Sequence, residues 1–147
     1  MTIQFEQDLA QAGSELDAAR SELLAIVQSL TEADLDKTRR GAWSVRSTLA
    51  HVIQAEWWYA RGVATLRELD PQPPVDPGPL DAVRDVSLAL QAARAALTDA
   101  CDGVDEEHFY LLRKIGPQDY SVLSILENCA DHDREHARQV AELAGKS

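Results

Sequence analysis

Apolar residues in the first thirty positions recur in alternating steps of four and three, which is the spacing of one face of a helix in a bundle. Most positions between them are polar or small. The pattern therefore predicts a long helix over residues 1–30. The face that it would bury consists of Phe5, Leu9, Ala12, Leu16, Ala19, Leu23, Ile26 and Leu30.

The next segment, LTEADLDKTRRGAWS, interrupts this pattern. Thr31 can cap a short acidic turn, Gly41 breaks the chain, and Ser44 can cap a new helix. A second helix is predicted from Val45 to Leu69. It is apolar around most of its circumference, so we expect it to be the most buried element. Its polar residues form one strip: Arg46, Ser47, Gln54, Arg61 and Glu68.

A proline-rich segment, DPQPPVDPGP at residues 70–79, cannot be a helix or a central strand, because proline lacks the amide donor and fixes an extended backbone. We call it the crossover. At about 3.1 Å per residue it spans ~31 Å, most of the ~37 Å length of a 25-residue helix. A third helix, marked by apolar steps from Leu80 to Leu97, can therefore start near the beginning of the second helix and run parallel to it.

After Gly103, the segment VDEEHFYLLRKIGPQD is predicted to be irregular, with one helical turn. A last helix is predicted from about Tyr120 to Ala144. No strand pattern competes with these helices. Four long helices joined by one long crossover predict an all-α four-helix bundle. A length of 147 residues suits a single domain over residues 1–147.

Charge and composition exclude several classes of partner. The chain has 14 Lys and Arg against 25 Asp and Glu, a formal net charge of −11. Nucleic acid and anionic membrane surfaces would repel it. It has no apolar run long enough for a membrane span, and its first residues lack the features of a signal peptide. The two cysteines, Cys101 and Cys129, form no motif. We therefore expect a cytoplasmic protein that binds neither nucleic acid nor membrane.

Two of the four histidines, His132 and His136, lie four residues apart in the stretch CADHDREHARQV. This spacing puts both imidazoles on one face of the last helix, about 6 Å apart. They are either a metal-binding pair or two exposed surface residues. His51 is the candidate for a third ligand, because it lies ~10 Å into the second helix and His136 lies ~12 Å from the end of the last one. These depths coincide only if the two helices are antiparallel. His108, beside two acidic residues, reads as solvated surface.

Two other metal-site patterns fit poorly. HDREH matches the HxxEH pattern of inverted zinc peptidases, but Glu135 lies ~100° around the helix from His136. A ferritin-like di-iron site needs Glu-x-x-His on two helices, and the second helix offers EWWY at the matching place. Neither site is made.

Glu56 and Asp133 are the candidate catalytic acids. Asp133 falls near the middle of the apolar stripe of the last helix. A weak similarity between WSVRSTLAHV (43–52) and YSVLSILENC (120–129) would place Glu56 opposite Asp133. Either carboxylate can orient a ligand imidazole or move a proton. The alternative is that each pairs with a buried arginine or a backbone donor.

The neighbouring aromatic residues and one cysteine also allow two interpretations. Trp57, Trp58 and Tyr59 can line a pocket, although aromatic residues on a buried helix more often belong to the core. Cys129, one turn before His132, can face a metal, although a small buried filler is the commoner role.

The stretches WSVRSTLAHVIQAE (43–56) and ADHDREHARQV (130–140), each after an acidic turn, resemble the DinB family, a superfamily of DinB- and YfiT-like metal-dependent bundle proteins. The resemblance implies an up-down-down-up four-helix bundle, often a homodimer. It also implies a divalent metal held by three histidines that map onto His51, His132 and His136. Ser47 departs from the family, which commonly has an acidic residue there, and this affects helix capping rather than the site.

Three neutral imidazoles leave coordination positions open on a divalent ion, with Zn or Ni favoured and Fe or Mn as alternatives. Such an ion lowers the pKa of a bound water or thiol. Mycothiol-dependent maleylpyruvate isomerase and bacillithiol transferases resemble this sequence. The leading hypothesis is a metal-dependent transferase or isomerase that activates a low-molecular-weight thiol, or water, toward a small-molecule substrate. The alternative is a non-catalytic metal-binding or ligand-sensing dimeric bundle.

Overall fold

The computed structural model describes residues 1–147 and is mostly helical, as the sequence predicts. Four long helices make up most of the chain: α1 (Ile3–Ser29), α2 (Val45–Leu66), α3 (Val83–Cys101) and α5 (Val122–Ala144). The shorter elements are the 3-10 helix η1 (Ala33–Asp36), the helix α4 (Glu106–Tyr110) and the strands β1 (Arg113–Ile115) and β2 (Gln118–Tyr120).

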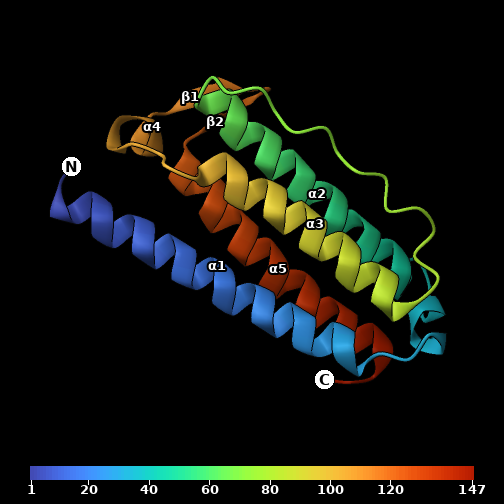
Figure 1. Cartoon of the computed structure of the whole chain (residues 1–147). Helices are drawn as coiled ribbons and strands as arrows, with labels where there is room; N and C mark the ends of the chain where they lie inside the picture. The colour runs from blue at the N-terminus through green and yellow to red at the C-terminus, as the bar shows by residue number, and fades with distance from the viewer.

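The four long helices lie side by side (Figure 1). Helix α1 packs against α5, and α2 packs against both α3 and α5. Helices α1 and α5 run in one direction, and α2 and α3 run in the other (Figure 1). The crossover contains no helix or strand and runs back along the outside of the helices, so that α3 begins beside the start of α2. This arrangement makes α2 and α5 antiparallel neighbours.

Serine side chains fix the starts of α2 and α5. The Ser44 hydroxyl accepts a hydrogen bond from the Ser47 amide, which confirms the predicted cap, and Ser121 accepts one from the Ser124 amide. Each cap satisfies a backbone donor that the first helical turn leaves without a partner. Ser47 thus takes part in capping and not in the histidine site.

Two helix boundaries differ from the prediction. Helix α2 ends at Leu66 instead of Leu69, because Glu68 adopts a left-handed conformation with φ of 57° and the Leu69 amide bonds back to the Ala64 carbonyl. Helix α5 begins at Val122, because Tyr120 belongs to β2. In both cases local backbone hydrogen bonds make the helix shorter than the spacing of its apolar residues predicts.

The expectation that the chain contains no strands was wrong. Strands β1 and β2 form a short antiparallel hairpin in which Arg113 pairs with Tyr120 and Ile115 with Gln118. Gly116 has a positive φ of 63°, which glycine adopts without steric cost, and so permits the tight turn. Strands of three residues are too short to show a period of two. The helical turn expected in this segment is α4.

A cluster of 32 buried hydrophobic residues fills the space between the helices. Helix α2 contributes 12 buried residues of all kinds, more than any other helix, as its broad apolar surface predicts. Four polar or charged residues are buried among the long helices within this apolar surrounding: Arg20, Thr48, Glu56 and Asp133. None of the helices has the length and apolar character needed to span a bilayer.

Candidate metal centre

The three histidines predicted as ligands converge on one point. Nε2 of His51, on α2, lies 3.1 Å from Nε2 of His132, on α5. Nε2 of His132 lies 3.0 Å from Nε2 of His136, one turn further along α5. Together they form a group in which one ligand atom from each ring lies within 4.8 Å of the others. Helices α2 and α5 are antiparallel (Figure 1), which is the relative direction that the predicted convergence of the three rings requires.

The spacing of these nitrogen atoms fits a metal ion. Bonds of 2.0–2.1 Å place two ligand nitrogens about 2.8–3.0 Å apart at a right angle and about 3.3–3.4 Å apart at the tetrahedral angle. The two Nε2 separations of 3.0 and 3.1 Å therefore suit adjacent coordination positions. Imidazole nitrogen is a ligand that Zn, Ni and Fe accept.

The protonation of the rings also suits ligation. Burial, and then the neighbouring His136, lower the pKa of His51 below its usual value. Burial, and then His136 and His51, lower the pKa of His132 to about 4. Both rings are therefore neutral at pH 7, and a neutral imidazole has a lone pair to give. No carboxylate hydrogen-bonds to any of the three rings.

Gln139 fixes the tautomer of His136. Its Oε1 lies 2.7 Å from Nδ1 of His136. An amide oxygen only accepts, so the Nδ1–H of the ring donates to it and the lone pair stays on Nε2, facing the other histidines. A partner of this kind is typical of metal-bound histidines. Gln139 was not among the residues predicted for the site, although its position three residues after His136 on the same helix face was a usable signal.

Behind the histidines lies a buried cluster of four charged side chains, Arg20, Glu56, Arg94 and Asp133. Nε of Arg20 lies 3.0 Å from Oδ2 of Asp133, and Arg20 also pairs with Glu56. Nε of Arg94 lies 2.8 Å from Oε2 of Glu56, and its Nη2 lies 3.1 Å from Oδ2 of Asp133. The charges balance, and each of the four long helices contributes one residue.

These contacts match the alternative in which Glu56 and Asp133 each pair with a buried arginine instead of acting on the metal site. Both side chains are 1% exposed, and both arginines contact both carboxylates. The sequence placed the two acids opposite each other but did not identify Arg20 and Arg94. The available signal was a lone arginine four residues after Leu16 and after Leu90, each on the apolar face of its helix.

Cys129 and His108 lie outside the histidine group. Sγ of Cys129 is 3.8 Å from Oε1 of Glu56 and 3.9 Å from Nη2 of Arg94. Burial, and then the two carboxylates of the cluster, raise the pKa of its thiol far above the usual value. Cys129 is therefore a buried filler beside the charged cluster. His108 pairs with Asp105 at 2.8 Å near the surface, in keeping with its predicted place.

Aromatic rings surround the histidines. Trp43 lies edge-to-face with His51, with ring centroids 5.2 Å apart, and Tyr59 lies edge-to-face with His132 at 6.0 Å. Trp58 contacts both Tyr59 and Tyr120, each at 5.5 Å. An open cavity of about 360 Å³ lies here, lined by His51, Gln54, Ala55, Trp58, Tyr59, Tyr120, Asn128 and His132. We call it the aromatic cavity.

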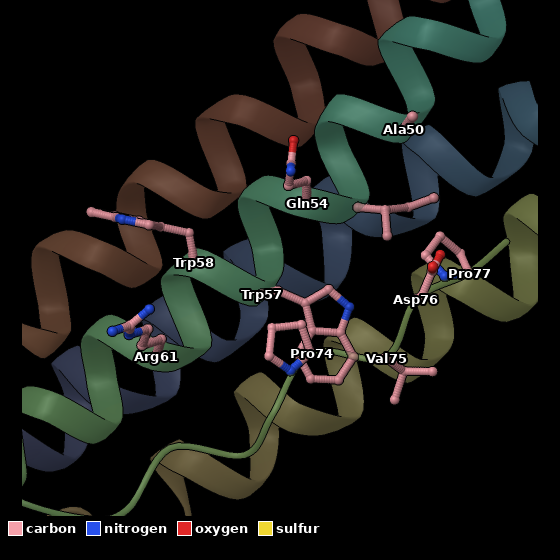
Figure 2. Close-up of a pocket in the computed structure, with 10 residues that line it drawn as sticks. Ala50, Gln54, Trp57, Trp58, Arg61, Pro74, Val75, Asp76 and Pro77 are labelled. Carbon is pink, nitrogen blue, oxygen red and sulfur yellow. The ribbon is translucent and has the colours of Figure 1, made fainter.

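A second cavity, of about 550 Å³, lies between α2 and the crossover (Figure 2). The side chain of Trp57 points into it toward Pro74 and Val75, whereas the side chain of Trp58 points away from the crossover (Figure 2). Trp57 is 6% exposed and belongs to the core, whereas Trp58 is 42% exposed. Trp57 is thus mainly a core residue, whereas Trp58 is the partly exposed residue that lines a pocket. We call this second space the crossover cavity.

Comparison with known proteins identifies the family of the chain. The family model described as the DinB superfamily matches residues 15–140, which include all three histidines and both acids of the cluster. Neither the curated proteins nor the solved structures gave a match to the chain. The family match covers most of the sequence, and it includes both stretches that carry the resemblance. The chain therefore belongs to the DinB superfamily.

Proposed function

We propose that this protein is a metal-dependent enzyme whose divalent ion is held by His51, His132 and His136. The observation that carries the proposal is the convergence of three Nε2 atoms at 3.0 and 3.1 Å. Three protein ligands are the pattern of catalytic zinc sites, because they leave a coordination position free for another molecule. Zn or Ni suits three imidazoles best, and Fe or Mn are the alternatives.

The proposed reaction is a transfer or isomerisation in which a low-molecular-weight thiol, or water, attacks a small substrate. The ion would supply a lowered pKa for the bound thiol or water. The protein residues supply neutral ligand nitrogens, and Gln139 holds the His136 ring in its ligating tautomer. The aromatic cavity, which His51 and His132 help to line, gives a substrate access to the site.

The charged cluster suggests a role for Glu56 and Asp133 other than proton transfer. Asp133 lies between the two ligating histidines of α5, and Glu56 lies on the same helix as His51. Their ion pairs with Arg20 and Arg94 connect α2 and α5 to α1 and α3. We propose that both acids position the helices that carry the ligands.

The alternative function is a non-catalytic metal-binding or ligand-sensing dimeric bundle. The engagement of both acids by arginines supports it, because no carboxylate of the predicted pair is free beside the histidines. For either function, we propose one domain over residues 1–147 with an up-down-down-up four-helix topology, which the helix directions in Figure 1 support. The homodimer and the cytoplasmic location stay predictions.

Metal analysis of the untagged protein tests the proposed site. We expect about one equivalent of divalent metal per chain, and loss of it in His51→Ala, His132→Ala and His136→Ala with the helical circular dichroism spectrum retained. His108→Ala is the matched control and should keep its metal, because His108 pairs with Asp105 outside the group. Equal metal content in all four variants would refute the site. Unfolding of the three site variants would indicate a structural metal.

A transfer assay separates the enzyme from the non-catalytic bundle. Metal-loaded protein is mixed with several low-molecular-weight thiols and a model electrophile such as chlorodinitrobenzene, and formation of the thioether is followed. The enzyme hypothesis predicts a rate above that of the free thiol for at least one thiol, and loss of that rate in His136→Ala. The absence of any acceleration with a fully metal-loaded protein would favour the non-catalytic alternative.

A further inference from the structure

We propose that the aromatic cavity binds an uncharged aromatic molecule, so that the substrate of the metal centre is a neutral aromatic compound. This inference rests on the proposed function, because the cavity opens on the histidines. It concerns the part of the substrate that the metal does not touch. Three independent features of the cavity support it: its rings, its lack of charged side chains and its size.

The rings form a wall beside the ligands. Trp58 and Tyr59 come from α2, and Tyr120 comes from the hairpin strand β2. Each contact in the series from Tyr120 to Trp58, Tyr59 and His132 is edge-to-face, with centroid distances of 5.5 to 6.0 Å. Trp58 nevertheless remains 42% exposed. A flat ring that enters the cavity would add stacking contacts in the range of 4.5–7 Å that aromatic pairs prefer.

The charge of the lining selects against ionised substrates. Apart from the two histidines, its polar residues are Gln54, Tyr59, Tyr120 and Asn128, and it contains no Lys, Arg, Asp or Glu. On the part of the substrate that the metal does not touch, a charged group would lose water without gaining a protein partner of opposite charge. The amides of Gln54 and Asn128 can donate to or accept from a carbonyl, hydroxyl or nitro group. The lining therefore favours a neutral ring with a polar substituent.

The crossover cavity differs from the aromatic cavity in this respect. It contains Arg61 and Asp76, and Arg61 forms no ion pair. It shares only Gln54 and Trp58 with the aromatic cavity.

The size of the aromatic cavity limits the substrate. A volume of about 360 Å³ puts the aromatic cavity at the small end of ligand sites, which suits a compound of one or two rings.

Nuclear magnetic resonance titration of the full metal-free chain with acetophenone, a neutral aromatic ketone, tests the proposal without a cation that would attract an anionic probe. Two probes serve as comparisons: cyclohexyl methyl ketone, which has the same substituent on an aliphatic ring, and benzenesulfonate, which is a charged aromatic. We expect acetophenone to bind at least about threefold more tightly than either one. Equal affinity for the aliphatic ketone would overturn the aromatic selection, and tighter binding of benzenesulfonate would overturn the charge selection.

Variants locate the binding site. Trp58→Ala should weaken acetophenone binding about three- to tenfold, and Trp58→Phe should restore it to within about twofold, because an aromatic ring is retained. Val75→Ser is the matched control, since Val75 lines the crossover cavity and not the aromatic cavity. Unchanged binding in Trp58→Ala, or an equal loss in Val75→Ser, would place the ligand elsewhere and refute the proposal.

Cobalt loading separates this inference from the proposed function. Paramagnetic Co²⁺ in the histidine site should broaden the acetophenone signals, whereas diamagnetic Zn²⁺ should not. If the protein binds no metal, the proposed function fails, and the Trp58 titrations of the metal-free protein still test the cavity. If Co²⁺ binds and acetophenone shows no broadening, the metal site stands and the substrate inference fails.

Discussion

Replacing Arg94 by methionine should destabilise the protein strongly, although Arg94 contributes little to the hydrophobic core. Its guanidinium contacts Glu56 at 2.8 Å and Asp133 at 3.1 Å, and both carboxylates are 1% exposed. Without Arg94, Arg20 is the only cation near two buried anions. The substitution therefore leaves one negative charge uncompensated inside the helices.

The size of the effect follows from the burial of the cluster. Removing one partner from a buried ion pair costs about 3–5 kcal/mol. The Arg94 side chain is 15% exposed, so some water reaches the site and the lower value applies, about 3 kcal/mol. For a chain of this length, each kcal/mol lowers the melting temperature by about 2–4 °C, so Arg94→Met should melt about 6–12 °C lower.

Urea unfolding, followed by circular dichroism with a chelator present, measures this cost without a contribution from bound metal. The double variant Arg94→Met/Glu56→Met keeps the neutral Arg20–Asp133 pair and should lose about 2 kcal/mol less than the sum of the single variants. Arg134→Met, which breaks a partly exposed pair with Glu15, is the control and should cost less than about 1 kcal/mol. A cost for Arg94→Met no larger than that of the control, or strict additivity in the double variant, would refute a buried, coupled cluster.

Three further predictions follow from single contacts. Gln139→Leu removes the acceptor for the Nδ1–H of His136 and should weaken metal binding about 10–100-fold without changing the melting temperature of the metal-free protein; calorimetric titration that shows parental affinity would contradict this. The Lys37 ammonium, and then the Thr31 amide, hold the pKa of Asp34 well below its usual 3.8. The Asp34 carboxylate therefore stabilises the fold fully when the pH is above the usual pKa. This stabilisation is lost as the pH falls toward the lower pKa of the folded protein. Asp34→Asn should therefore be less stable than the parent at pH 7, with a difference in urea midpoint that shrinks below about pH 4, and a difference independent of pH would argue against the ion pair. Burial raises the pKa of the Cys129 thiol, so iodoacetamide at pH 8 should modify Cys129 on the order of 100-fold more slowly than a free thiol until urea unfolds the chain, as peptide mass mapping can show; rapid labelling of the folded protein would contradict its burial.

The sequence by itself determined the helices and the identity of the candidate ligands. Apolar spacing of three and four residues shows where a helix must bury one face, and Ser44 marks where α2 begins. Prolines exclude regular structure from the crossover. The i, i+4 spacing of His132 and His136 follows from helix geometry alone. These features are local, so a single sequence is enough to predict them. The strands escaped prediction because three residues are too few for a periodic pattern.

Only the tertiary structure decided what the charged and aromatic residues contact. Glu56 and Asp133 are acids on apolar faces in the sequence, and their partners Arg20 and Arg94 are 36 to 113 positions away along the chain. The distance between the nitrogens of His51 and His132 depends on the packing of α2 against α5. Likewise, adjacent Trp57 and Trp58 differ in burial, at 6% and 42% exposed, and only Trp58 lines the aromatic cavity, because successive residues on a helix are rotated by about 100° and meet different neighbours. Contacts between distant segments depend on how whole helices pack, which no local pattern specifies.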